Sequence, residues 1–163
     1  MGNDAARTLL ALVSPLVAIA IAIWGFRRST RADKLEAFFR MFERYLAPDV
    51  RMGRQLVHRQ ISGRSVEEIE ALDQSIRTSV GYSLAVMNSI AIACEAKYVD
   101  SDVVARSMGR SFATTMAAAG PYVDYLEKVR GFRPYPYAER LAPTINPPSS
   151  RERRRPSDSS PAE

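Results

Sequence analysis

The stretch from Thr8 to Phe26 constrains this chain most, because its 19 residues include no charged side chain. A helix of roughly 20 apolar residues matches the hydrocarbon thickness of a bilayer, and lipid obliges every backbone amide to pair within the segment. We therefore expect an N-terminal transmembrane helix. A cleaved signal peptide is the alternative. The length of the stretch and the basic block that follows it favour a retained anchor.

The residues that follow this stretch set its expected orientation. An indole favours the level of the lipid headgroups, and a tryptophan stands near the end of the stretch, followed by four basic residues. The membrane-interface residues that we predict are Trp24, Arg27, Arg28, Arg31 and Lys34. Loops rich in Lys and Arg stay in the cytoplasm, so we expect the N-terminus outside and the C-terminal domain in the cytoplasm.

A second stretch, residues 79–96, is apolar or small almost throughout. A helix that is apolar on all sides is buried either in a core or in lipid. This one contains Asn88 and Glu95, and a carboxylate is costly in hydrocarbon. We therefore expect a central core helix. The alternative is a second membrane span, which would place everything after Tyr98 outside the cytoplasm.

Helical periodicity dominates the chain, so the expected fold class is all-α: an N-terminal transmembrane helix followed by a small helical bundle and a disordered basic Pro/Ser-rich tail. One apolar stripe recurs at helical spacing, formed by Leu35, Phe38, Phe39, Phe42 and Leu46. This stripe is expected to pack into the core rather than to form a binding surface.

Local signals place the ends of further helices. Pro48 suits the first turn of a second helix. Ser65 and Glu68 have the spacing of a capping box, after which a long helix should run to about Tyr98. Asp100 is expected to cap a helix that stops before a Gly-Pro pair. Two shorter helices are expected at residues 122–130 and 137–141.

The last part of the chain changes in composition. Seven of the ten prolines lie in the last 33 residues, and a polar, charged, proline-rich segment lacks the apolar surface that folding requires. Within it, a basic cluster is a candidate contact for an anion or a partner, formed by Arg151, Arg153, Arg154 and Arg155. The expected organisation is an anchor with its basic flank at 1–31, a helical cytoplasmic domain at 32–142 and a disordered tail at 143–163.

The sequence shows no constellation typical of an active site. Residues 109–113 are one residue short of a nucleophile elbow, which needs a preceding strand and a histidine partner. The single histidine, His58, is far away along the chain and is expected at a helix end or on the surface. The single cysteine, Cys94, lies in the apolar stretch and is expected to be a small core residue. We therefore expect no enzyme, no cofactor and no metal site.

Several short patterns together resemble a known family. They are Phe42-Glu43-Arg44-Tyr45, then Pro48, Arg51 and Arg54, then Ser89-Ile90-Ala91, Asp100-Ser101-Asp102-Val103-Val104, Pro121-Tyr122-Val123 with Arg130, and Tyr137-Ala138-Glu139-Arg140-Leu141-Ala142. Over about residues 8 to 142 the chain resembles the bacterial domain-of-unknown-function family 4760, single-pass proteins with a small helical domain. The resemblance implies a bacterial inner (plasma) membrane location and gives no catalytic residue to carry over. The chain departs from the family pattern at Ala85, Asn88 and Lys97.

These features predict a non-enzymatic interaction or scaffold module, tethered to the cytoplasmic face of the membrane. The expected partners are the lipid bilayer and either an unknown protein or a second copy of the chain, rather than nucleic acid. Two alternatives stay open. One is a small membrane-perturbing protein of the holin or toxin type, and the other is a membrane-tethered protein that binds RNA through its basic tail.

Overall fold

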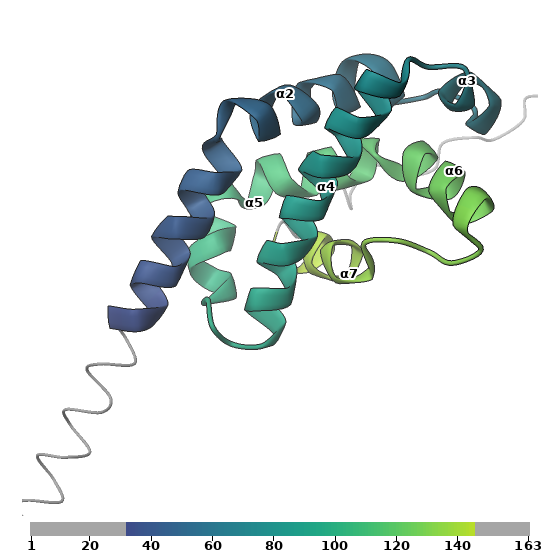
Figure 1. The fold of residues 1–163 in the computed structure, drawn as a ribbon. Helices are drawn as coiled ribbons and strands as arrows, with labels where there is room; N and C mark the ends of the chain where they lie inside the picture. The colour runs from purple at the N-terminus through teal and green to yellow at the C-terminus, as the bar shows by residue number, and fades with distance from the viewer. Residues whose placement is uncertain (1–31, 146–163) are drawn as a thin grey trace, which may run out of the picture.

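The computed structural model describes residues 32–145, and every regular element among them is a helix. The first helix, which we call the leading helix, covers residues 32–46. It is followed by α2 (Pro48–Leu56), the π-helical turn η1 (Val57–Ile61), α3 (Val66–Glu70), α4 (Gln74–Glu95), α5 (Ser101–Ala118), α6 (Gly120–Arg130) and α7 (Pro136–Ile145). The leading helix lies at one side of the domain (Figure 1).

The fold class predicted from the sequence needs one correction. Residues 32–145 are all-α, as expected, but none of their helices is both long enough and apolar enough to cross a membrane. A transmembrane helix is therefore not supported as part of the fold. The two longest elements, α4 and α5, carry arginine and hydroxyl side chains at intervals along their length, which lowers their mean hydropathy. The predicted span at residues 8–26 and the tail at residues 146–163 lie outside the described residues.

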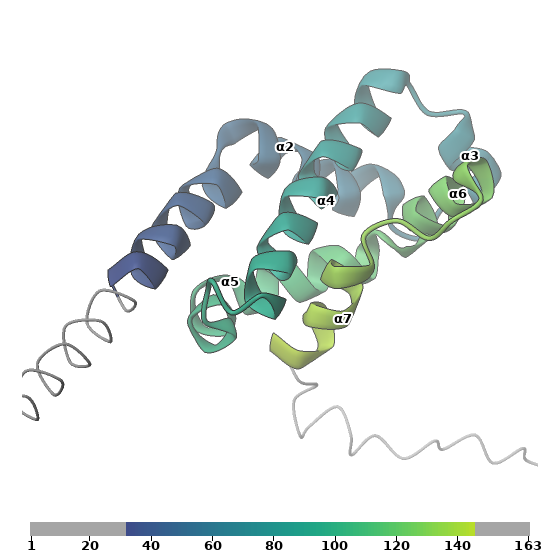
Figure 2. The same cartoon turned by 60° about the horizontal axis from the view of Figure 1, so that its bottom comes forward.

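Helix α4 is the centre of the domain. It packs against α2 on one side and against α7 on another, and α5 also packs against α7 (Figures 1 and 2). Side chains all along α4 are fully buried, among them Val80, Leu84 and Met87. The prediction of a central core helix at residues 79–96 is thus confirmed, and its apolar character on several sides follows from having neighbours on several sides.

The contact between α2 and α4 is close because three small residues meet there. Gly53 of α2 lies against Ser79 and Ser83 of α4, so closely that a side chain on Gly53 would collide with both. The hydroxyl of the buried Ser83 donates a hydrogen bond of 3.2 Å to the carbonyl oxygen of Val50. This bond satisfies a polar group inside the core and fixes the register of the two helices.

The predicted helix starts are confirmed, but the long helix after the capping box is broken. Ser65 accepts from the backbone N–H of Glu68, whose carboxylate accepts from the N–H of Ser65. Helix α3 ends after five residues, and Asp73 starts α4 as a second N-cap by accepting from the N–H of Ser75 at 3.1 Å. Asp100 caps α5 in the same way. The periodicity of apolar residues continues across the break, which is why the sequence reads as one helix.

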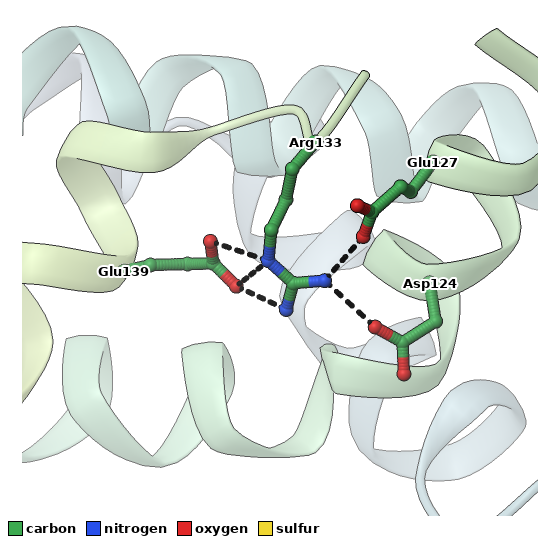
Figure 3. Close-up of polar contacts among 4 residues, drawn as sticks. All are labelled: Asp124, Glu127, Arg133 and Glu139. Atoms are coloured by element: carbon green, nitrogen blue, oxygen red, sulfur yellow. Dashed lines mark hydrogen bonds and ion pairs between the residues drawn. The ribbon is translucent and has the colours of Figure 1, made fainter. Parts of the chain in front are cut away.

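The turn between α6 and α7 is held by one arginine. Helix α6 ends at Gly131, whose φ of 74° is in the left-handed region that glycine tolerates best. Two residues later, Arg133 donates through Nη1 to Asp124 at 2.9 Å and to Glu127 at 2.6 Å, and through Nη2 to Glu139 at 2.7 Å (Figure 3). Arg133 thereby ties α6 to the start of α7.

Candidate interaction surface

The leading helix presents three large apolar side chains to solvent. Leu35, Phe39 and Leu46 are 52%, 53% and 51% exposed, whereas Phe38 is 7% and Tyr45 is 2% exposed. The prediction that the whole stripe packs into the core is therefore wrong for the three exposed residues. The helix faces the domain with the side that carries Phe38 and Tyr45, and Phe42 at the edge of that side is partly buried against the core. Leu35, Phe39 and Leu46 lie on the more exposed side.

A cluster of polar contacts fastens the end of the leading helix to the domain. The guanidinium of Arg54 lies 3.8 Å from the ring centroid of Tyr45, donates to the Ser111 hydroxyl at 2.9 Å, and donates to the carbonyl oxygen of Tyr45 at 3.2 Å. The Tyr45 hydroxyl donates to the same Ser111 oxygen at 3.0 Å. Since Arg54 belongs to α2 and Ser111 to α5, this cluster fixes the leading helix relative to both.

The exposed apolar surface continues from the leading helix onto α2. Met52 is 55% exposed. It lines a shallow hollow of about 280 Å³ together with Leu46, Pro48 and Arg51. Apolar side chains that gather on one face in this way, with polar groups at the margin, are typical of a protein interaction site.

Charged residues flank this surface. Glu36 pairs with Arg40, and Arg44 lies 3.6 Å from the carboxylate of Asp49. Glu43 is exposed on the same helix. Exposed pairs of this kind contribute little to stability, but a charged margin around an apolar centre is the usual arrangement of an interface.

Only one of the site residues predicted from the sequence is among the residues that the structure describes. Lys34 is exposed on the leading helix. The other predicted interface and tail residues lie outside the described residues: Trp24, Arg27, Arg28, Arg31, Arg151, Arg153, Arg154 and Arg155. Their roles, and the predicted location of the chain in the cell, stay predictions.

The residues considered for chemistry have ordinary structural positions. Residues 109–113 lie within α5, so the serine there is helical and not at a strand-to-helix turn. His58 is exposed in η1, and its Nε2 lies 3.3 Å from the hydroxyl of Thr115. Between residues 32 and 145, no three His, Cys, Asp or Glu side chains are grouped so that they could hold a metal ion.

Cys94 is half-buried, and its surroundings lower its reactivity. Burial, followed by the negative charge of Asp100, raises the pKa of the Cys94 thiol from 9.0 to about 11. Because the thiolate is the reactive form, we expect Cys94 to react with iodoacetamide at pH 8 about a hundredfold more slowly in the folded chain than in urea. Equal rates in the two states would contradict this.

The same shift predicts the direction of a pH effect on stability. As the pH rises, the unfolded chain loses the thiol proton first, near its ordinary pKa of 9.0, while the folded chain keeps it to about 11. Deprotonation therefore favours unfolding, and stability falls across this interval. Urea unfolding monitored by circular dichroism should show a smaller fall in Cys94→Ser than in the wild-type chain.

These observations define a class: a small all-helical domain whose leading helix is firmly mounted and exposes an apolar face. The chain belongs to the family described as Domain of unknown function (DUF4760), whose model matches residues 12–144. This confirms the resemblance found in the sequence. No curated protein and no solved structure matches the chain.

Sequence reasoning named the apolar residues of the leading helix but missed the contacts that hold it in place. It noted Arg54 and Tyr45 only within the family patterns, and it expected Phe39 to lie in the core. The partner that separates the roles of these two aromatic residues is Ser111, which lies 66 positions beyond Tyr45 in the chain.

Proposed function

We propose that the protein is a non-enzymatic, self-associating helical module, in which the leading helix pairs with the leading helix of a second copy. The observation that carries this proposal is the exposed apolar face of that helix. Three of its large side chains are each half exposed, and leaving such a contiguous face in water has a cost that pairing would remove.

The spacing of these residues favours another copy of the same helix as the partner. Leu35, Phe39, Phe42 and Leu46 follow one another at intervals of four, three and four residues. This is the alternation of the two core positions in a heptad, and it lets two identical helices interlock side chain into groove. We refer to these four residues as the seam.

The contacts that hold the leading helix against the domain lower the entropic cost of its pairing with a second copy. The seam extends over about 16 Å of helix, which is short for an isolated pair of helices. However, the contacts of Arg54 with Tyr45 and Ser111 already hold the helix in place. Little conformational entropy then remains to be lost on pairing, and the hollow beside Met52 offers further apolar area at one end of the seam.

A crosslinking experiment with the full chain in cells tests the proposal. In a Cys94→Ser background, Glu43→Cys places one thiol beside the seam without removing an apolar residue. A cell-permeant bis-maleimide should then trap a dimer. Adding Phe39→Glu should lower the dimer yield about tenfold, because it removes apolar burial and inserts a charge.

The matched control is Phe132→Glu. Phe132 is 60% exposed, comparable to Phe39 at 53%, but it lies in the turn between α6 and α7. Phe132→Glu should leave the dimer yield unchanged. If Glu43→Cys gives no dimer, or if Phe39→Glu and Phe132→Glu give equal yields, the leading helix does not mediate self-association.

A further inference from the structure

A shallow, open pocket of about 750 Å³ lies between α4 and α6, and none of the residues that line it belongs to the seam. This volume is within the range of small-molecule sites. Its wall includes four tyrosines, Tyr82, Tyr122, Tyr125 and Tyr135, and two arginines, Arg77 and Arg130. Figure 3 shows the turn that Arg133 holds. Tyr135, which lines the pocket, follows that turn directly before the start of α7.

The wall is fixed by hydrogen bonds to the backbone of α4. The hydroxyl of Tyr122 donates a hydrogen bond of 2.8 Å to the carbonyl oxygen of Arg77. The hydroxyl of Tyr135 donates one of 3.1 Å to the carbonyl oxygen of Gly81. A Cβ atom at Gly81 would lie only 2.8 Å from the Tyr122 hydroxyl, so this approach depends on glycine. The pocket is therefore a built feature of the fold and not a gap left by chance packing.

The charge of the wall is positive. Among the residues that line the pocket there is no carboxylate. Arg77 donates through Nη1 to the Tyr125 hydroxyl at 2.8 Å and to the carbonyl oxygen of Glu70 at 3.2 Å, which leaves Nε and Nη2 for a ligand. Within residues 32–145, Arg130 makes no hydrogen bond or ion pair.

Several other arginines of the domain pair with carboxylates, unlike Arg77 and Arg130. Arg133 is surrounded by the carboxylates of Asp124, Glu127 and Glu139 (Figure 3). Arg140 pairs with Glu95 at 2.8 Å. Guanidinium groups that keep free donors beside a pocket are suited to a phosphate, which accepts two parallel hydrogen bonds from one arginine.

The hydroxyls of the buried tyrosines in the wall carry no negative charge that would repel a bound anion. Burial, and after it the neighbouring Tyr135, raises the pKa of Tyr122 to about 12, although the positive charges of Arg130 and Arg77 act in the opposite direction. Burial likewise raises the pKa of Tyr135. Both hydroxyls are neutral at physiological pH, so they add no negative charge to the pocket and are not bases there.

We propose that this pocket binds a small phosphorylated compound that carries a planar ring. The phosphate is held by Arg77 and Arg130, and the ring packs against the tyrosine wall, where Tyr82 is the most accessible of the aromatic side chains at 36% exposure. Ring packing of this kind adds to the affinity that the charges provide. The proposal is independent of self-association, because the pocket and the seam share no residue.

Titration calorimetry of the full chain tests this with three probes: AMP, inorganic phosphate and adenosine. AMP should bind more tightly than either of the others, and its affinity should fall as salt is added. Arg130→Gln should weaken AMP binding about tenfold, which is the loss expected for a charge-assisted hydrogen bond. Tyr82→Ala should weaken AMP binding and leave phosphate binding unchanged.

The matched control is Arg106→Gln, on the exposed side of α5 and outside the pocket. It should bind AMP as the wild-type chain does. Circular dichroism and the unfolding midpoint show that each variant is folded. The proposal is overturned if AMP gives no binding at about 1 mM, if phosphate or adenosine binds as tightly as AMP, or if Arg130→Gln and Arg106→Gln behave alike.

Discussion

Replacing Gly53 by alanine should lower the free energy of unfolding by about 3 kcal/mol. The new Cβ atom would lie 2.6 Å from the Cβ of Ser83 and even closer to the carbonyl oxygen of Ser79. Because that oxygen belongs to the backbone of α4, it has no side-chain freedom with which to move away. The two helices must separate, and the core between them loses packing.

Gly120→Ala is the control for this effect. Gly120 also lies in a helix, α6, but a Cβ atom there would have no neighbour within 4 Å. Alanine should stabilise this position by about 0.5 kcal/mol, because it restricts the unfolded chain. Urea unfolding monitored by circular dichroism gives both values. A Gly53→Ala variant as stable as Gly120→Ala would show that α2 and α4 are not in close contact.

Helix ends were the part of the fold that the sequence predicted best. Ser65 with Glu68, and Asp100 alone, cap helices in the structure as they were expected to. A cap depends on a side chain and a backbone N–H two or three residues away, so the necessary information is local. Asp73 does the same, yet it was missed because the apolar pattern across it looked continuous.

The environment of the leading helix could not be predicted in this way. Periodicity shows which residues share a face, but it does not show how much of that face a partner will cover. Phe38 and Phe39 are adjacent in the sequence and similar in type, but the first is buried and the second is exposed. What separates them is which side of the helix faces the domain: Phe38 shares the buried side with Tyr45, whose hydroxyl bonds to Ser111 of α5.

The pocket could be predicted from local sequence patterns even less than the environment of the leading helix. Tyr122 and Tyr135 reach the backbone of α4 across 45 and 54 positions of sequence. Tyr122 falls in a helix expected from the sequence and Tyr135 falls between two expected helices, and nothing near them in the chain marks a binding site. Only the tertiary arrangement brings the tyrosines and the two arginines together.

Asn88 joins α4 to α7 through a cap that comes from a distant part of the sequence. Its side-chain oxygen accepts from the backbone N–H groups of Tyr137 and Ala138, at 3.2 and 3.1 Å. These groups belong to the first turn of α7, where a local residue normally supplies the cap. The residue before α7 is Tyr135, with a φ of 60° and its side chain turned to the pocket. A residue of α4 therefore replaces the local cap.

Asn88→Ala should accordingly lower the free energy of unfolding by about 3 kcal/mol, since it leaves two part-buried N–H groups without an acceptor. Asn88→Asp keeps the acceptor and adds a negative charge at a helix N-terminus, so it should be within about 1 kcal/mol of the wild-type chain. Urea unfolding gives both free energies. Hydrogen exchange at Tyr137 and Ala138 should accelerate only in the alanine variant, because α7 then frays from its first turn. If aspartate, which has the size of asparagine and keeps the acceptor oxygen, is as damaging as alanine, the acceptor at position 88 is not what stabilises α7.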